Sequence, residues 1–368
     1  MSIRLLSLIQ HPDRPTTETF IGFHRAGIDI TVSCPPEHPN HALLVSAGVP
    51  TIDLRLNGTI DPRGIRALRA LVQGGRYDIV HTYYNDAISN AALAVLGLPV
   101  KLVAYRGIVG AVGFLDPVSW LRYLNPRIDR IICVCDAIRR HFLGMRPKFL
   151  RMPEERPVTV HKGHKLEWYT ATPADLAEFG IPAGGFVVGC ISNYRPRKGI
   201  EYLVRAMDLL PPDVPVHLLL VGRMSGRALD RAIARSRARD RIHRPGYRKD
   251  APAISAACDV FCLPSVKREG LPRSVIEAMA YRVPPIVTNS GGSPELVVDG
   301  SSGLVVPVRD PGALAAAIER LYRDAELRRR LGEGARDRIA RDFRNEDTVR
   351  KIIDVYRSLV PEKAGSIA

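Results

Sequence analysis

The feature that most constrains the fold is an alternation of apolar strands and amphipathic helices that runs through the chain twice. In the first half, strand patterns such as residues 3–9 and 28–34 alternate with helical ones such as residues 61–73, which start at an Asp-Pro pair. The second half begins the same order again at residues 186–192. Strands and helices joined by short Gly- and Pro-rich connections are typical of a parallel, doubly wound sheet. The sequence therefore predicts an α/β fold of two Rossmann-like domains.

The stretch of residues 151–185 interrupts this alternation. It is rich in Pro, Lys and Gly, and we interpret it as the connection between two domains. A chain of 368 residues is long enough for each domain to have its own core. We predict an N-terminal domain over residues 1–165, a C-terminal domain over residues 166–345, and a closing segment, 346–368, whose helix packs back on the N-terminal domain. A ligand is expected in the cleft between the domains, at the carboxyl ends of the strands.

The chain carries a net charge of +15, and its basic residues are spread over both halves. This balance favours partners that carry phosphate, or an anionic membrane surface. Residues 1–9 are apolar but contain Arg4 and lack a cleavage site, and no apolar stretch reaches 18 residues. We therefore expect a cytoplasmic protein, with peripheral association to the inner face of the cell membrane.

The six cysteines lie mostly in apolar runs such as IICVC and ACDVFC. Their spacing lacks the second paired cluster that a zinc finger requires. We therefore expect buried, reduced thiols, with neither a disulfide nor a structural metal.

The strongest chemical signal is the segment of residues 264–280, PSVKREGLPRSVIEAMA. Glu269 lies in the loop after a predicted strand, and Glu277 lies eight residues later on the following helix. Two carboxylates this far apart suit the hydroxyl groups of a long polar ligand better than they suit a shared proton. The alternative is structural: Glu277 caps or solvates its helix, and Glu269 pairs with Lys267 or Arg273.

A second signal is the basic segment SNYRPRKG, residues 192–199, which follows a predicted strand and opens a helix. Arg195 and Lys198 are three residues apart, so both side chains can reach one diphosphate, Arg as a fork and Lys as a point charge. Such cations stabilise a departing diphosphate without a metal. The alternative is an ordinary solvated basic loop.

A third signal is the sequence GGSPE at residues 291–295. Its glycines allow a tight turn and a close backbone approach to a ligand, and Ser293, Pro294 and Glu295 suit the first turn of a helix. Helix starts of this kind bind polar groups well. The alternative is an ordinary turn between a strand and a helix.

These three segments, in this order and spacing, resemble glycosyltransferase family 4, whose members have the two-domain GT-B fold. The resemblance covers most of residues 185–345, and its hallmark is the Glu-x7-Glu pattern after the strand end. It implies a retaining transfer from a nucleotide-diphosphate sugar, with an N-terminal acceptor domain and a C-terminal donor domain. Under this resemblance the nucleotide sugar is a co-substrate, and no metal or other cofactor is needed.

The resemblance also implies roles for individual residues of the C-terminal domain. Glu269, with the amides of Gly270 and Leu271, would bind the hydroxyls of the transferred sugar. Arg195 and Lys198 would hold the diphosphate, and these two residues together with Glu269 are catalytic candidates. The donor-binding residues implied elsewhere are Glu277 at the ribose, Arg223, Tyr247 and Arg248 near the base, and Gly292 and Glu295.

The N-terminal half resembles the family less closely. Asp78–His81 matches the family's DIVH strand, so His81 becomes a catalytic candidate, with a satisfied structural histidine as the alternative. The family's second histidine is Tyr83 here, and its Gly-rich loop is replaced by residues 11–15. The candidate contacts to a phosphate or to the acceptor are then Arg14, Thr17, Tyr83 and Arg106.

The sequence thus predicts a retaining, metal-independent hexosyltransferase that takes a nucleotide sugar and a glycan or lipid-linked acceptor, in the synthesis of cell-envelope polysaccharide or lipopolysaccharide. The main alternative is a non-catalytic nucleotide-sugar-binding protein, or a basic nucleic-acid- or lipid-binding protein, on the same fold. Nucleic acid is disfavoured because the basic residues are scattered and no helix-turn-helix, zinc-finger or RNP pattern occurs. A sugar-nucleotide epimerase or hydrolase would need a further base that we do not find, and a NAD enzyme would need a GxGxxG loop. No obligate protein partner is inferred.

Overall fold

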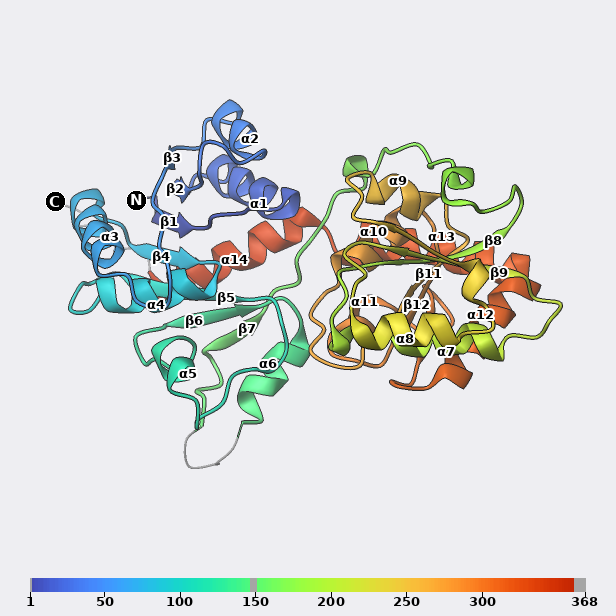
Figure 1. Ribbon diagram of the computed structural model, residues 1–368. Coiled ribbons are helices and arrows are strands. Elements are labelled where there is room, and N and C mark those ends of the chain that lie inside the picture. Colours follow the sequence, from blue (N-terminus) through green and yellow to red (C-terminus); the bar gives the residue numbers. More distant parts are fainter. Residues whose placement is uncertain (1, 146–150, 361–368) are drawn as a thin grey trace. The chain divides into compact units, whose positions relative to one another are not determined.

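The computed structural model describes residues 2–145 and 151–360. It contains two compact units: one combines residues 1–163 with residues 343–368, and the other comprises residues 164–342. Each unit is built on one parallel sheet with helices packed against it (Figure 1). The predicted fold class, α/β with two Rossmann-like parallel sheets, is confirmed.

The N-terminal unit has a seven-stranded sheet in the order β3-β2-β1-β4-β5-β6-β7. Neighbouring strands are parallel throughout, because helices carry the chain back between them. The strand order reverses at β1 and β4, the position at which open α/β sheets bind ligands. The elements of this unit are β1 (Arg4–Leu8), α1 (Arg14–Arg25), β2 (Asp29–Ser33), α2 (His41–Ser46), β3 (Thr51–Ile52), α3 (Pro62–Gly75), β4 (Ile79–Thr82), α4 (Asn85–Ala94), β5 (Lys101–Arg106), α5 (Pro117–Leu121), β6 (Arg130–Cys133), α6 (Asp136–Leu143), β7 (Pro157–Thr159) and α14 (Asn345–Leu359).

The last helix, α14, returns to the N-terminal unit and packs along α1 (Figure 1). Its Tyr356 is fully buried, and the Tyr356 ring lies edge-on to Phe23 with the ring centroids 5.6 Å apart. At the start of α14, the Asn345 side-chain amide donates hydrogen bonds to Pro15 O at 3.2 Å and to Thr19 Oγ1 at 3.0 Å. The last helix of the chain thereby completes the core of the first unit.

The C-terminal unit has a six-stranded parallel sheet in the order β10-β9-β8-β11-β12-β13. This order again reverses in the middle, at β8 and β11, so the carboxyl ends of these two strands are the expected position of a ligand. The elements are β8 (Phe186–Ile191), α7 (Ile200–Leu209), β9 (Val216–Val221), α8 (Arg227–Arg235), β10 (Ile242–Gly246), α9 (Ala251–Ala256), β11 (Val260–Leu263), α10 (Arg273–Ala280), β12 (Pro285–Thr288), α11 (Ser293–Leu296), β13 (Leu304–Val306), α12 (Pro311–Arg323) and α13 (Ala325–Asp342).

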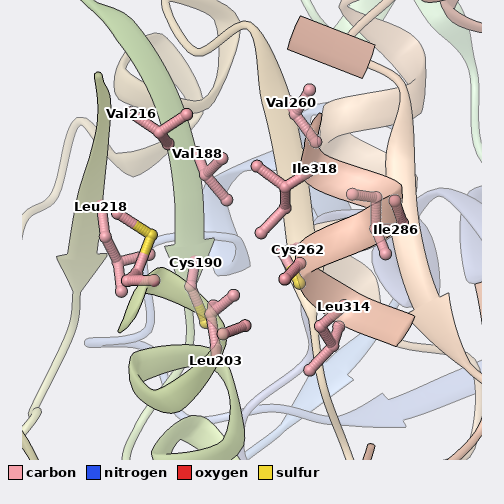
Figure 2. Close-up of a cluster of buried hydrophobic side chains, with 14 of the residues drawn as sticks. Val188, Cys190, Leu203, Val216, Leu218, Val260, Cys262, Ile286, Leu314 and Ile318 are labelled. Carbon is pink, nitrogen blue, oxygen red and sulfur yellow. The ribbon is translucent and has the colours of Figure 1, made fainter. Parts of the chain in front are cut away.

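One core cluster of the C-terminal unit forms between its sheet and the helices on one face. Figure 2 shows Val188 of β8 and Val260 of β11 facing Ile318 of α12, with Leu203 of α7 in the same cluster. All four side chains are fully buried. Burial of each such side chain is worth about 1.5–3 kcal/mol, so the strands whose ends carry the candidate site are held firmly by packing.

Three local expectations differ from the structure. Residues 151–185, interpreted as a connection, contain β7, which pairs with β6 and belongs to the first sheet. The stretch of residues 105–127, which shows no regular pattern in the sequence, contains the short helix α5. The sequence offers Thr16 or Thr17 as the cap of α1, but this helix starts at Arg14 and its cap is Asp13, whose carboxylate accepts a hydrogen bond from Thr16 N.

All six cysteines lie in the described part of the chain and are buried free thiols. Within residues 2–145 and 151–360, no helix is both long enough and apolar enough to cross a membrane.

Candidate functional site

A pocket of about 550 Å³ opens in the C-terminal unit where β8, β9 and β11 end. Its size lies within the usual range for small-molecule sites, about 300–1,000 Å³. The polar and charged residues that line it are Ser192, Asn193, Arg195, Arg197, Lys198, Tyr247, Arg248, Lys249, Glu269, Arg273, Ser274 and Glu277. The structure therefore brings the two glutamates and the two cations of the sequence motifs into one pocket.

Glu269 is bound by two side chains. The Lys198 ammonium lies 3.0 Å from Oε1 and 2.9 Å from Oε2 of its carboxylate. The Ser265 hydroxyl donates a hydrogen bond of 2.6 Å to Oε2. Glu269 is only 8% exposed, and a carboxylate this buried needs such partners. The expected alternative, in which Glu269 pairs with Lys267 or Arg273, does not hold.

Close backbone approaches hold the loops around Glu269 together. Gly199 has a φ of +65°, and a Cβ at this position would lie 2.4 Å from Pro264 O. Gly291 has a φ of +59°, and a Cβ there would lie 2.0 Å from Glu269 O. The next amide, Gly292 N, donates to the same oxygen at 3.1 Å. The glycines of the GGSPE segment therefore allow a close approach of the Glu269 loop, whereas we expected them to allow a close approach of a ligand.

Glu277 lies on α10 and is paired with an arginine on the same helix. Arg273 Nε donates a 2.7 Å hydrogen bond to Glu277 Oε1, one helical turn away. Glu277 is 8% exposed and faces the pocket. The alternative in which Glu277 merely solvates its helix therefore does not hold. Arg273 was not singled out as a site residue in the sequence, although its spacing of four residues from Glu277 was a signal that could have found it.

The electrostatics of the pocket favour an anion. Each of its two glutamates is already neutralised by a cation, through the Lys198–Glu269 and Arg273–Glu277 pairs. Arg195 and Arg197 line the same pocket, and within the described residues neither forms a salt bridge. A ligand that carries a diphosphate would therefore meet two unpaired guanidinium groups.

Two of the residues expected near the base, Tyr247 and Arg248, also line the pocket. Tyr247 is 65% exposed. Arg248 is held by Asp250 at 2.7 Å and Glu178 at 3.1 Å, with its guanidinium 5.1 Å from the centre of the Phe179 ring. Arg248 is therefore held in a fixed position in the pocket wall. The exposed Tyr247 ring can stack on the base of a nucleotide.

Of four other residues expected to bind the donor, one lines the pocket and three do not. Leu271 lines the pocket, whereas its neighbour Gly270 is buried behind it. Arg223 is exposed, and its backbone N–H donates to Asn193 Oδ1 at 3.1 Å. Glu295 lies on α11 outside the pocket wall, and its carbonyl accepts a 2.7 Å hydrogen bond from Arg338.

His81, a catalytic candidate from the sequence, is fully buried in the N-terminal unit. Its Nδ1 lies 2.6 Å from the Tyr356 hydroxyl and 3.1 Å from the Tyr83 hydroxyl. Burial lowers the pKa of the imidazole to about 3, so the ring is neutral at physiological pH. These contacts favour a structural role for His81 through Nδ1, with Tyr83 in the same packed cluster, whereas Nε2 is buried and has no hydrogen-bond partner among the described residues.

The start of α1 is closed by an ion pair that the sequence did not reveal. Lys162 Nζ lies 2.9 and 2.8 Å from the two carboxylate oxygens of Asp13. Thr16 N donates to the Asp13 carboxylate at 3.1 Å, and Thr17 N donates to the Asp13 carbonyl at 2.9 Å. These N–H groups are therefore already satisfied, and the expected phosphate contact at Thr17 is not available here. Arg14, the other residue expected there, lies 3.9 Å from Glu18 on the same helix.

Replacing Asp13 by asparagine should make the free energy of unfolding depend less on pH under acidic conditions. Burial raises the pKa of Asp13, but the charge and hydrogen bonds of Lys162 and the hydrogen bonds from Thr16 outweigh it and bring the pKa to about 2. A lowered folded-state pKa stabilises the fold above about pH 4, and this contribution is lost as the pH falls towards 2. The difference corresponds to about 2 kcal/mol. Urea unfolding at pH 6 and pH 2.5 should show that the parent protein loses more of its free energy of unfolding at the lower pH than Asp13→Asn does. Equal losses in the two proteins would contradict this prediction.

Arg106, expected near the acceptor, is a buried support of its own loop. Its Nε donates to Ile108 O at 2.9 Å, its other guanidinium nitrogen reaches Gly110 O, and the group lies 4.7 Å from the centre of the Tyr123 ring. It is 6% exposed. Within the described ranges, no group of three or more His, Cys, Asp or Glu side chains is arranged to hold a metal ion.

Comparison with known proteins gives matches over both units. The family described as glycosyl transferases group 1 matches residues 172–338, and the glycosyl transferase 4-like domain matches residues 16–163. A D-inositol 3-phosphate glycosyltransferase of Corynebacterium urealyticum is 31% identical over 56% of this chain and 53% of its own length. The chain spans about half the length of this relative and of two other curated relatives that it matches.

Two further proteins are similar over nearly the whole chain. The UDP-Gal:alpha-D-GlcNAc-diphosphoundecaprenol alpha-1,3-galactosyltransferase of Escherichia coli is 24% identical over 98% of this chain and 97% of its own. A glycosyltransferase from Rickettsia africae, known from a crystal structure, superposes with a TM-score of 0.82 at 19% identity, covering 98% and 99% of the two chains. This solved structure shares the fold.

Proposed function

The chain belongs to glycosyltransferase family 4, and we infer from this membership that it transfers a sugar from a nucleotide-diphosphate sugar to a hydroxyl group of an acceptor. The observation that carries the proposal is the pocket in which Lys198 binds Glu269 and Arg273 binds Glu277. It combines carboxylates for sugar hydroxyls with cations for a diphosphate. These are the two recognition chemistries that a nucleotide sugar requires.

We assign the diphosphate to Lys198 and Arg195. As the bond between the anomeric carbon and the β-phosphate oxygen breaks, negative charge grows on the phosphate, and nearby fixed cations stabilise it. The acceptor oxygen forms the new bond on the face that the phosphate leaves, and its proton passes to that phosphate. This retaining course needs no metal, because the two cations supply the charge that a metal would otherwise supply.

Lys198 and Glu269 would exchange partners when the donor binds. Without a ligand, each satisfies the other at 2.9–3.0 Å. A donor offers phosphate oxygens to the ammonium and sugar hydroxyls to the carboxylate, so neither buried charge is left unpaired. Glu269 would then orient the sugar while Lys198 faces its leaving group. Ser265 keeps Glu269 in place throughout this exchange.

The acceptor we propose is a glycan or a lipid-linked glycan of the cell envelope. The Escherichia coli relative that matches the chain end to end is named for an acceptor linked to diphosphoundecaprenol. A net charge of +15 would favour the anionic surface at which such acceptors lie. We propose a cytoplasmic enzyme that associates peripherally with the membrane and contributes to polysaccharide or lipopolysaccharide synthesis.

A thermal-shift screen against UDP-, GDP-, ADP- and dTDP-sugars tests donor binding. One donor class should stabilise the protein, by about 2.7 kcal/mol at a hundred times its dissociation constant, with or without EDTA. Glu277→Ala should strongly reduce the shift, because the ribose loses its carboxylate partner. Glu319→Ala, which removes a glutamate from an Arg–Glu helix pair outside the pocket, should leave it intact. Absence of any shift, or an equal shift in Glu277→Ala, would count against the donor site.

A further inference from the structure

We propose that Arg273 is a positioning residue for nucleotide recognition: it holds Glu277 so that the carboxylate oxygen it does not engage accepts a hydrogen bond from a ribose hydroxyl. The proposal rests on the function proposed above and names a residue that determines specificity for ribonucleotide donors. Arg273 is the first residue of α10, and Glu277 lies one turn further on. Both side chains line the pocket.

Arg273 forms a hydrogen bond with only one of the two carboxylate oxygens of Glu277. Arg273 Nε binds Glu277 Oε1 at 2.7 Å, and this hydrogen bond fixes the direction of the second oxygen, Oε2. The Glu277 side chain is 11% exposed, whereas that of Arg273 is 60% exposed. The arginine therefore covers a carboxylate that is otherwise enclosed by the helix and the pocket wall.

Helix stability does not explain this pair. A cation at the first residue of a helix opposes the helix dipole, and an arginine that precedes its glutamate by four residues is the weaker of the two orders. The chain contains the stronger order elsewhere, in Glu319–Arg323 on α12. The arrangement on α10 is therefore better explained by the pocket than by the helix.

The two glutamates of the pocket differ in how they are held. Glu269 is fixed by both Lys198 and Ser265. For Glu277, Arg273 is the one side chain in the described chain that makes a hydrogen bond to the carboxylate. Loss of Arg273 would leave the Glu277 carboxylate free to rotate, and its hydrogen bond to a ligand would lose its direction.

The readout is the preference for ribose over deoxyribose. The dissociation constants of UDP, GDP and ADP would be measured by calorimetry, and the tightest binder compared with its 2′-deoxy and 3′-deoxy forms. A hydrogen bond to a charged group is worth about 1.5–3 kcal/mol, so the parent protein should prefer ribose roughly 10- to 100-fold. In Arg273→Ala this preference should fall to about threefold or less. Arg273→Lys should retain an intermediate preference, because lysine supplies the charge without the fixed geometry of the guanidinium.

Arg323→Ala is the matched control, because it removes the arginine of a helical Arg–Glu pair outside the pocket. It should leave the ribose preference unchanged. An unchanged preference in Arg273→Ala, or an equal loss in Arg323→Ala, would overturn the proposal. A parent protein that binds nucleotides without preferring ribose would also overturn it, and the proposed function would stand. A parent protein that binds none of these three but binds dTDP would overturn this proposal alone, whereas one that binds none of the four nucleotides would overturn the proposed function as well.

Discussion

Replacement of Lys198 by alanine is expected to lower the turnover number about 10²–10³-fold, the usual cost of removing one group that stabilises transition-state charge. The affinity for the donor should fall much less. The charge that Lys198 meets on the leaving phosphate grows during the reaction, so the interaction strengthens between ground state and transition state. In the free protein this ammonium is held 2.9 Å from Glu269 Oε2, which keeps it at the site before the donor arrives.

Steady-state kinetics of Lys198→Ala, with donor dissociation constants measured by calorimetry, test this split. Lys267→Ala is the control, because Lys267 is an exposed lysine two residues from Glu269 and does not line the pocket. Its turnover should match that of the parent protein. A loss in Lys198→Ala that is confined to the apparent Michaelis constant would show that Lys198 binds the ground state only.

Replacement of Tyr356 by alanine should lower the free energy of unfolding of the N-terminal unit by about 3–5 kcal/mol, the usual cost of truncating a buried aromatic side chain. Tyr356 is fully buried, packs edge-on against Phe23, and bonds His81 Nδ1 at 2.6 Å. The cavity left by the ring would weaken the packing of α14 against the rest of the N-terminal unit. The effect should be large because a ring and a hydrogen bond to a buried histidine are lost together.

Tyr356→Phe separates these two contributions. It keeps the ring and should cost only about 1 kcal/mol, because His81 retains the Tyr83 hydroxyl as a partner. Urea unfolding can be followed for the N-terminal unit alone by the fluorescence of Trp120 in a Trp168→Phe background, since the chain has two tryptophans, one in each unit. Equal losses in the two variants would mean that the hydrogen bond, and not the ring, carries the stability.

The long, capped elements of the fold could be predicted from the sequence. The helix expected at residues 61–73 is α3, which has 14 residues and is capped by Asp61, whose carboxylate accepts a hydrogen bond from Gly64 N. Several short elements were missed. β3 has two residues and β7 has three, too few to show a period, and both exist because they pair with a neighbouring strand at a sheet edge. Helix α2 has no side-chain cap that would mark its start.

The residue types of the site could also be predicted, but not their pairing. Lys198 and Glu269 were assigned to one ligand, yet their mutual ion pair joins residues 71 positions apart. Asp13 and Lys162 are 149 positions apart, and both looked like ordinary loop residues. Sequence patterns carry information about residues that are close together in the chain. These contacts depend instead on how two loops meet at the carboxyl ends of the strands.

His81 shows the same difference between local pattern and packing. Its motif could be found from four residues, but its environment is set by Tyr356, 275 positions later. The resemblance of this strand to the family therefore did not establish that the histidine is accessible. The glycines at 291 and 292 were correctly expected to allow a close approach, and only the approaching group, Glu269 O, differs from the expected ligand.

The most direct test of sugar transfer is release of nucleoside diphosphate from each donor class in the presence of a bacterial envelope extract that contains lipid-linked and lipopolysaccharide acceptors. Release from one donor class, proportional to enzyme and stopped by Lys198→Ala, is the expected result. No release from any donor, or release that Lys198→Ala leaves unchanged, would contradict the assignment of this pocket to glycosyl transfer.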